Sequence, residues 1–133
     1  MQFFSEFLNS TNQKNILVVD DSPVLCRAYA CALEAWGYNV GIAEDGLVGL
    51  ARLRSERYQL VITDYEMPRC NGLEFFKQAQ LEIDGDGLPP FILITGTPLQ
   101  ELAGQLDGFV AAFAKPVGIG VLRDELGHYF GNS

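Results

Sequence analysis

The sequence predicts an α/β protein with a doubly wound parallel sheet and helices on both faces. Five short apolar runs alternate along the chain with five segments of helical character, as in repeated strand–helix units. The runs are largely continuous, which is typical of strands that helices bury on both faces. A chain of 133 residues with 48% hydrophobic residues has the size and composition of one domain with its own core.

The first unit carries the clearest local signals. Residues 16–19 are continuously apolar and predict a strand. Ser22 then supplies a helix N-cap, and Pro23 occupies the first helical position, where its missing N–H costs nothing. We expect this helix to run to Trp36, because Gly37 stops it.

The following units repeat the pattern. Further strands are predicted over residues 40–43, 60–63 and 91–94, with a fifth ending near Ala114. Further helices are predicted over residues 47–57, 73–81 and 119–130, with a short one from Pro98 towards Gln105. The crossover before the fifth strand is therefore expected to be helical like the others.

The chain divides into an N-terminal extension, residues 1–14, and a body, residues 15–133. The extension contains an apolar group that could form one helical face: Phe3, Phe4, Phe7 and Leu8. Such a face would pack on the body or on a second subunit, and a loosely docked tail is the equal alternative.

Charge and cysteine content narrow the function classes. The net charge is −8 and the nine basic residues are scattered, which argues against a nucleic-acid partner and favours a bound cation or a basic partner surface. Cys26, Cys31 and Cys70 form no metal-binding spacing, so we interpret them as packing residues in a reducing compartment. No segment has the length of a membrane span or the features of a signal peptide, so the sequence predicts a cytoplasmic protein with no membrane partner.

Polar side chains follow four of the predicted strands, at the point where each strand ends. They are Asp20 and Asp21, Asp64, Thr95 with Gly96, and Lys115 with Pro116. Because the carboxyl ends of parallel strands share one edge of the sheet, where ligands bind in such folds, we expect these residues to meet there.

Three carboxylates gathered at this edge need a cation. Each pair repels by roughly 4 kcal/mol at 4 Å in a medium of effective dielectric 20. Mg²⁺ suits a site of one or two carboxylates, waters and a phosphoryl oxygen, and Lys115 would favour an ionised Asp64. Carboxylate, metal, ammonium and hydroxyl together indicate phosphoryl transfer to an aspartate nucleophile.

The body resembles the receiver domains of two-component response regulators from residue 15 to about residue 130. The resemblance rests on an ordered set of motifs: Asp20-Asp21, Asp64-Tyr65-Glu66-Met67-Pro68 with Asn71-Gly72, Thr95-Gly96 and Lys115-Pro116. It implies that residues 15–133 form a receiver domain with a flavodoxin-like fold and the strand order 2-1-3-4-5. It also implies a cis bond between Lys115 and Pro116.

The resemblance also assigns roles at the sheet edge. It implies that Asp64 is the phosphoacceptor, that Asp21 binds Mg²⁺ directly and that Asp20 acts mainly through water. The backbone carbonyl of Glu66 would complete the metal ligands, together with Asp64. Thr95 and Lys115 would each bind a phosphoryl oxygen.

Two further positions bear on switching. Gly96 would leave room for the phosphoryl group. The chain departs from the family pattern at Ala112, three positions before Lys115, where many receivers carry a Tyr or Phe that changes rotamer on activation.

We therefore expect a phosphorylation-controlled switch and not an enzyme. Its partners would be a sensor histidine kinase or histidine phosphotransfer protein, a downstream protein, and, as one option, a second copy in a homodimer. One alternative is a haloacid-dehalogenase-like phosphohydrolase, which would place its nucleophile in an Asp-x-Asp motif and add a cap domain. Another is a receiver that is never phosphorylated and serves as an interaction scaffold.

Overall fold

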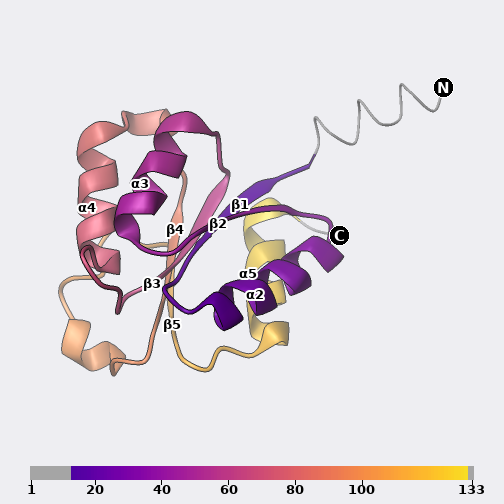
Figure 1. The fold of residues 1–133 in the computed structure, drawn as a ribbon. Helices are drawn as coiled ribbons and strands as arrows, with labels where there is room; N and C mark the ends of the chain where they lie inside the picture. Colours follow the sequence, from indigo (N-terminus) through magenta and orange to yellow (C-terminus); the bar gives the residue numbers. More distant parts are fainter. Residues whose placement is uncertain (1–12, 132–133) are drawn as a thin grey trace.

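A five-stranded parallel sheet forms the middle layer of the protein (Figure 1). The structure, a computed structural model, describes residues 13–131, so the predicted apolar face of the N-terminal extension lies outside the described residues. The strands are β1 (Asn15–Val19), β2 (Asn39–Ala43), β3 (Leu60–Asp64), β4 (Phe91–Thr95) and β5 (Ala111–Ala114). Their order is β2-β1-β3-β4-β5, which confirms the predicted fold.

Two pairs of helices cover the two faces of the sheet (Figure 1). Helices α2 (Pro23–Ala35) and α5 (Ile119–Phe130) lie on one face, and α3 (Gly46–Ser55) and α4 (Gly72–Glu82) lie on the other. Successive residues of β1 enter opposite cores: Ile16 and Val18 pack with α2 and α5, whereas Leu17 and Val19 pack with α3 and α4. The continuous apolar run of this strand is thus explained by burial on both faces.

Side-chain caps mark the beginnings of α2 and α3. The Ser22 side chain accepts a hydrogen bond from the Leu25 amide at 3.2 Å, and Pro23 follows as the first residue of α2. Asp45 caps α3 in the same way, with its Oδ1 3.0 Å from the Val48 nitrogen. These caps satisfy amides that have no partner inside the helix.

The connection between β4 and β5 differs from the prediction. Instead of a helix from Pro98 towards Gln105, it contains one 3₁₀ turn, η2 (Leu99–Leu102). Gly104 and Gly108 have φ angles of 85° and 95°, which are incompatible with a right-handed helix. A single turn between a proline and such a glycine is too short to propagate into an α-helix.

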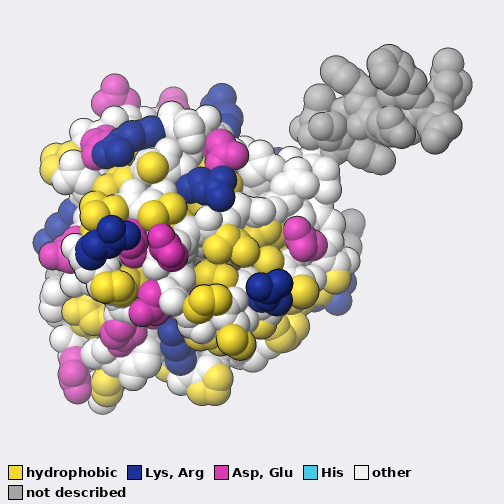
Figure 2. All heavy atoms as spheres, viewed as in Figure 1, with side chains coloured by type: hydrophobic (Ala, Val, Ile, Leu, Met, Phe, Trp, Pro, Cys, Tyr) yellow, Lys and Arg dark blue, Asp and Glu magenta, His cyan; other side chains and the backbone are white. Residues whose placement is uncertain are grey.

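The cysteine prediction is correct for two of the three side chains. Cys26 and Cys70 are buried, but Cys31 is exposed on α2, so it is not a packing residue. Within residues 13–131, no helix combines the length and apolar character needed to cross a bilayer. On the face shown in Figure 2, Lys and Arg side chains are interspersed with Asp and Glu.

Candidate functional site

The predicted site residues meet at the carboxyl edge of the sheet. The parallel register pairs Asp64 of β3 with Ile94, and Thr95 of β4 with Ala114. The neighbouring strands β3, β4 and β5 therefore end close to one another along the same edge of the sheet. The Lys115 amide then donates to the Thr95 carbonyl at 2.8 Å, which extends the pairing by one residue. The Lys115–Pro116 bond is cis, as the resemblance implied.

Three carboxylates form a cluster suited to a cation. Asp20, Asp21 and Asp64 each offer an oxygen, and these oxygens lie within 4.8 Å of one another. Asp20 and Asp64 are each 3% exposed, whereas Asp21 is open to solvent. Buried Asp64 Oδ1 has no hydrogen-bond partner, so it retains an unused acceptor. Hard oxygen ligands with spare acceptor capacity fit Mg²⁺.

Among the described residues, Lys115 is the only one whose positive charge lies within ion-pair distance of Asp64 and Asp20. Its Nζ lies 3.1 Å from Asp64 Oδ1 and 3.5 Å from Asp20 Oδ2. The approach to Asp64 lacks the angular geometry of a hydrogen bond, so it is an ion pair only. One ammonium therefore bridges two of the three acids and leaves negative charge uncompensated.

This imbalance appears in the ionisation of Asp64. Burial, followed by the neighbouring Asp20 anion, raises the pKa of Asp64 to about 7, although Lys115 acts in the opposite direction. A divalent cation would favour the ionised carboxylate, which is the form that can act as a nucleophile.

The way in from solvent is a shallow hollow beside the cluster. Its volume is about 420 Å³, and its lining residues are Asp21, Tyr65, Glu66, Met67, Pro68 and Asn71. A Cβ atom added to Gly96 would meet no heavy atom within 4 Å, so the site is also open at this residue.

The Glu66 side chain makes contacts that sequence reasoning missed. Its carboxylate accepts hydrogen bonds from the Thr95 hydroxyl at 2.8 Å, from the Thr97 hydroxyl, and from the Gly96 amide at 3.4 Å. Burial works against ionisation, but the hydroxyls of Thr97 and Thr95 hold the pKa of Glu66 at about 2. The sequence predicted a metal-binding role for the backbone carbonyl of this residue and did not indicate these side-chain contacts.

A second contact that the sequence did not indicate braces the loop after β3. Arg69 has a φ of 67°, a left-handed conformation that is rare for a residue with a side chain. Its guanidinium pairs with buried Asp45, whose Oδ2 lies 3.0 Å from Arg69 Nε. Burial opposes ionisation, but the Val48 amide and Arg69 keep the pKa of Asp45 below its ordinary value. Asp45 thus joins the cap of α3 to this loop.

Ala112 lies in β5 and packs against a small apolar cluster. The buried members of the cluster are Leu73, Leu93 and Leu102, with Tyr65, Leu106 and Phe109 partly buried around them. No aromatic side chain of β5 takes part in this cluster within the described strand, so the departure noted in the sequence persists in three dimensions.

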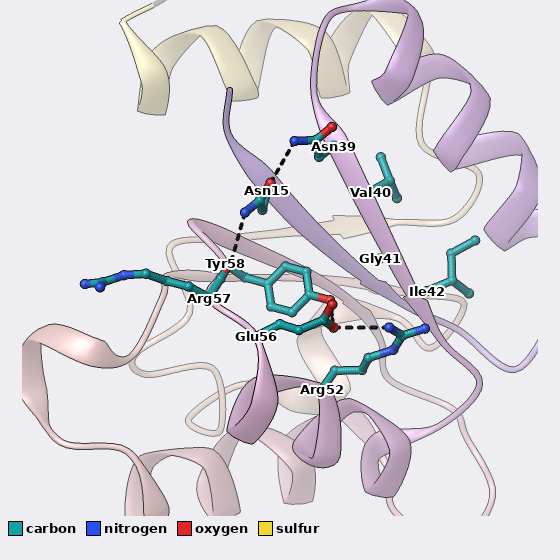
Figure 3. A pocket seen from close by; sticks show the side chains of 9 residues that line it. All are labelled: Asn15, Asn39, Val40, Gly41, Ile42, Arg52, Glu56, Arg57 and Tyr58. Carbon is teal, nitrogen blue, oxygen red and sulfur yellow. Dashed lines mark hydrogen bonds and ion pairs between the residues drawn. The ribbon is translucent and has the colours of Figure 1, made fainter. Parts of the chain in front are cut away.

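A larger hollow lies at the opposite end of the first two strands (Figure 3). It measures about 630 Å³, and its lining includes Asn15 and Asn39 at the start of β1 and β2. Arg52 is paired with Glu56 at 3.1 Å, and the Tyr58 hydroxyl donates to the same carboxylate at 2.7 Å. Its charged groups are thus partly satisfied by one another, and the acidic cluster remains the better candidate site.

Comparison with known proteins identifies a family. The model of the response regulator receiver domain matches residues 16–126. The chain is 34% identical over 104 residues to the transcriptional regulatory protein GlrR of Escherichia coli K12, covering 77% of this chain and 23% of that protein. It spans 16% to 40% of the length of such curated relatives.

Solved structures agree over nearly their whole length. A CheY-like response regulator receiver domain protein from Methanospirillum hungatei JF-1 superimposes with a TM-score of 0.81 at 28% identity, covering 90% of this chain and 94% of that one. The response regulator protein TrrA of Thermotoga maritima, in complex with Mg²⁺ and BeF, gives 0.77 at 28% identity, covering 87% and 98%.

Proposed function

The chain belongs to the response regulator receiver domain family, and from this premise we propose that Asp64 is the residue that takes up the phosphoryl group. Receiver domains of two-component response regulators are phosphorylated on aspartate, and this chain is one of them. The observation that carries the assignment is the position of Asp64, buried beside Asp20 and Asp21 and 3.1 Å from Lys115.

In the proposed reaction an Asp64 oxygen attacks the phosphorus of a phosphohistidine. A P–O bond forms as the P–N bond breaks, and the histidine nitrogen keeps the bonding electron pair. Lys115 and the Thr95 hydroxyl bind phosphoryl oxygens and stabilise the charge that develops on them. The donor is a sensor histidine kinase or a histidine phosphotransfer protein, and the output passes to a downstream protein.

The metal assigned to the site is Mg²⁺. Asp21, Asp64 and the Glu66 carbonyl would hold it, with Asp20 acting through water. When bound, it offsets the repulsion among the carboxylates and the incoming phosphoryl oxygens. The support in this chain is the set of carboxylate oxygens within 4.8 Å and the unsatisfied Asp64 Oδ1.

Intact-mass measurement after treatment with acetyl phosphate tests the assignment. We expect one phosphoryl adduct in the presence of Mg²⁺, little with a chelator, and none in Asp64→Asn. Asp21→Ala should raise the Mg²⁺ concentration needed for half-maximal adduct formation by roughly 10- to 100-fold. Asp84→Asn removes an exposed carboxylate outside the cluster and is the matched control.

The other outcomes point elsewhere. An adduct that persists in Asp64→Asn would move the nucleophile, first of all to Asp20. Sustained turnover of a generic phosphate ester would favour a phosphohydrolase. A chain that never takes up the group under these conditions would favour the interaction scaffold.

A further inference from the structure

The Glu66 side chain ties the loop after β3 to the loop after β4. Its Oε2 atom accepts from the hydroxyls of Thr95 and Thr97, and its Oε1 atom accepts from the Gly96 amide. The three donors are consecutive residues, and they are separated from Glu66 by 29 to 31 positions in the chain. One carboxylate therefore holds the whole beginning of the β4–β5 loop.

The Thr95 hydroxyl has one hydrogen to donate, and Glu66 accepts that hydrogen bond. Thr95 Oγ1 lies 2.8 Å from Glu66 Oε2, and it accepts a hydrogen bond from the Thr97 amide at 2.9 Å. Thr95 is fully buried, so the hydroxyl cannot turn towards bulk water instead. A hydroxyl donates one hydrogen bond at a time, so any second acceptor must displace Glu66.

We propose that Glu66 is a positioning residue that latches residues 95–97 in the unmodified chain. The latch is released when a phosphoryl oxygen accepts the hydrogen bond of the Thr95 hydroxyl in place of Glu66. The inference rests on the proposed function, because the competing acceptor is a phosphoryl oxygen on Asp64. A phosphoryl group also carries a charge of about −1.5 to −2, which repels the Glu66 carboxylate. Competition for the proton and repulsion thus act in the same direction.

The far end of the same loop is held by different contacts. Leu102 of η2 is 3% exposed and packs with Leu73 and Leu93. Between these two attachments, Gly96 and Pro98 are exposed. Releasing Glu66 would therefore free residues 96–98 while η2 stays docked, and this requires no aromatic ring at Ala112.

The first test needs no phosphorylation. In the unmodified chain, Glu66→Ala should move the Gly96 and Thr97 amide resonances towards their positions in the wild-type chain saturated with Mg²⁺ and beryllofluoride. Glu66→Gln keeps one acceptor oxygen and should give a smaller shift. Glu101→Gln removes the same charge from an exposed position on η2 and should leave both resonances in place.

The second test measures beryllofluoride affinity at saturating Mg²⁺. Glu66→Ala should bind this phosphoryl mimic about tenfold more tightly, since a hydrogen bond to a charged group no longer has to be broken. Thr97→Val leaves every charge unchanged but removes one latch contact, so it should tighten binding by a smaller factor, about threefold. The double variant should fall short of the product of the two effects.

Three results would overturn the latch: unmoved Gly96 and Thr97 resonances in Glu66→Ala, unchanged affinity in that variant, or a gain confined to Glu66 variants with none in Thr97→Val. The last would mean that only charge was removed. Failure of the proposed function is separate: the wild type would not bind beryllofluoride, whereas Glu66→Ala would still move the Gly96 and Thr97 resonances away from those of the unmodified wild type.

Discussion

The Asp64 carboxyl is held in a fold that disfavours its charge. Burial and the Asp20 anion raise its pKa from 3.8 to about 7. The folded chain thus binds this proton more tightly than the unfolded chain does. The contribution to stability is fully present below pH 4 and is lost as the pH rises to about 7, because ionisation is harder in the folded state.

When a chelator removes Mg²⁺, Asp64→Asn is therefore expected to be more stable than the wild type at pH 8. The excess in free energy of unfolding of Asp64→Asn over the wild type should be smaller at pH 5 than at pH 8 by roughly 2 kcal/mol or more. Urea titrations at the two pH values measure it. Asp84→Asn, at an exposed position, is the control, and an Asp64→Asn advantage that is equal at both pH values would contradict the buried-charge explanation.

Helix α3 contacts α4 through glycines, which lets the two elements approach closely. A Cβ on Gly49 would lie 2.8 Å from Phe75 Cζ, and one on Gly46 would lie 2.9 Å from Phe75 Cβ. Phe75 cannot easily retreat, because it is fully buried and its ring centroid lies 5.1 Å from that of Phe91. The close spacing of these helices depends on the absence of a side chain at Gly46 and Gly49.

Gly49→Ala should lower the free energy of unfolding by about 1 to 3 kcal/mol, because the added methyl overpacks the contact with Phe75. Gly120→Ala in α5 is the matched control: a Cβ there would meet nothing within 4 Å, so a gain of up to about 0.5 kcal/mol from helix propensity is expected. Urea denaturation compares them. Equal effects at the two positions would show that the α3–α4 contact tolerates a methyl group.

At the scale of the whole molecule, the site and Trp36 lie at opposite ends of α2. The helix begins at Pro23, beside the acidic cluster, and Trp36 caps its other end, about 20 Å away along the helix axis. The β4–β5 loop has a 3₁₀ turn where a helix was predicted, and Leu102 of that turn packs in a different apolar cluster from Trp36. A signal leaving the site through that segment would rearrange a loop and would not shift a rigid helix.

Binding of Mg²⁺ and beryllofluoride should therefore produce its largest amide shifts over residues 95–106 and 109–117, with little change at Trp36. The reason is that Thr95 and Lys115 are the groups proposed to move towards the phosphoryl oxygens, and they lie within these two segments. Two-dimensional spectra with and without the mimic decide the matter. Shifts confined to the metal ligands would favour the scaffold alternative.

The strands, most of the helices and the set of residues at the sheet edge could be predicted from local features of the amino-acid sequence. Each depends on a local pattern: the continuous apolar run of β1, the cap at Ser22, or a polar residue directly after a strand. Parallel strands turn such local positions into spatial neighbours without further information, so Asp20, Asp64 and Lys115 could be expected to meet.

The pairing of side chains from different loops became visible only in three dimensions. Glu66 meets Thr95 across 29 positions, and Asp45 meets Arg69 across 24, with no spacing or motif that links them. The missing helix before β5 has the same origin, since helical propensity near Pro98 lost to glycine conformations and to the docking of Leu102. Side-chain pairing between loops depends on how the strands place those loops, and no local preference of the chain encodes it.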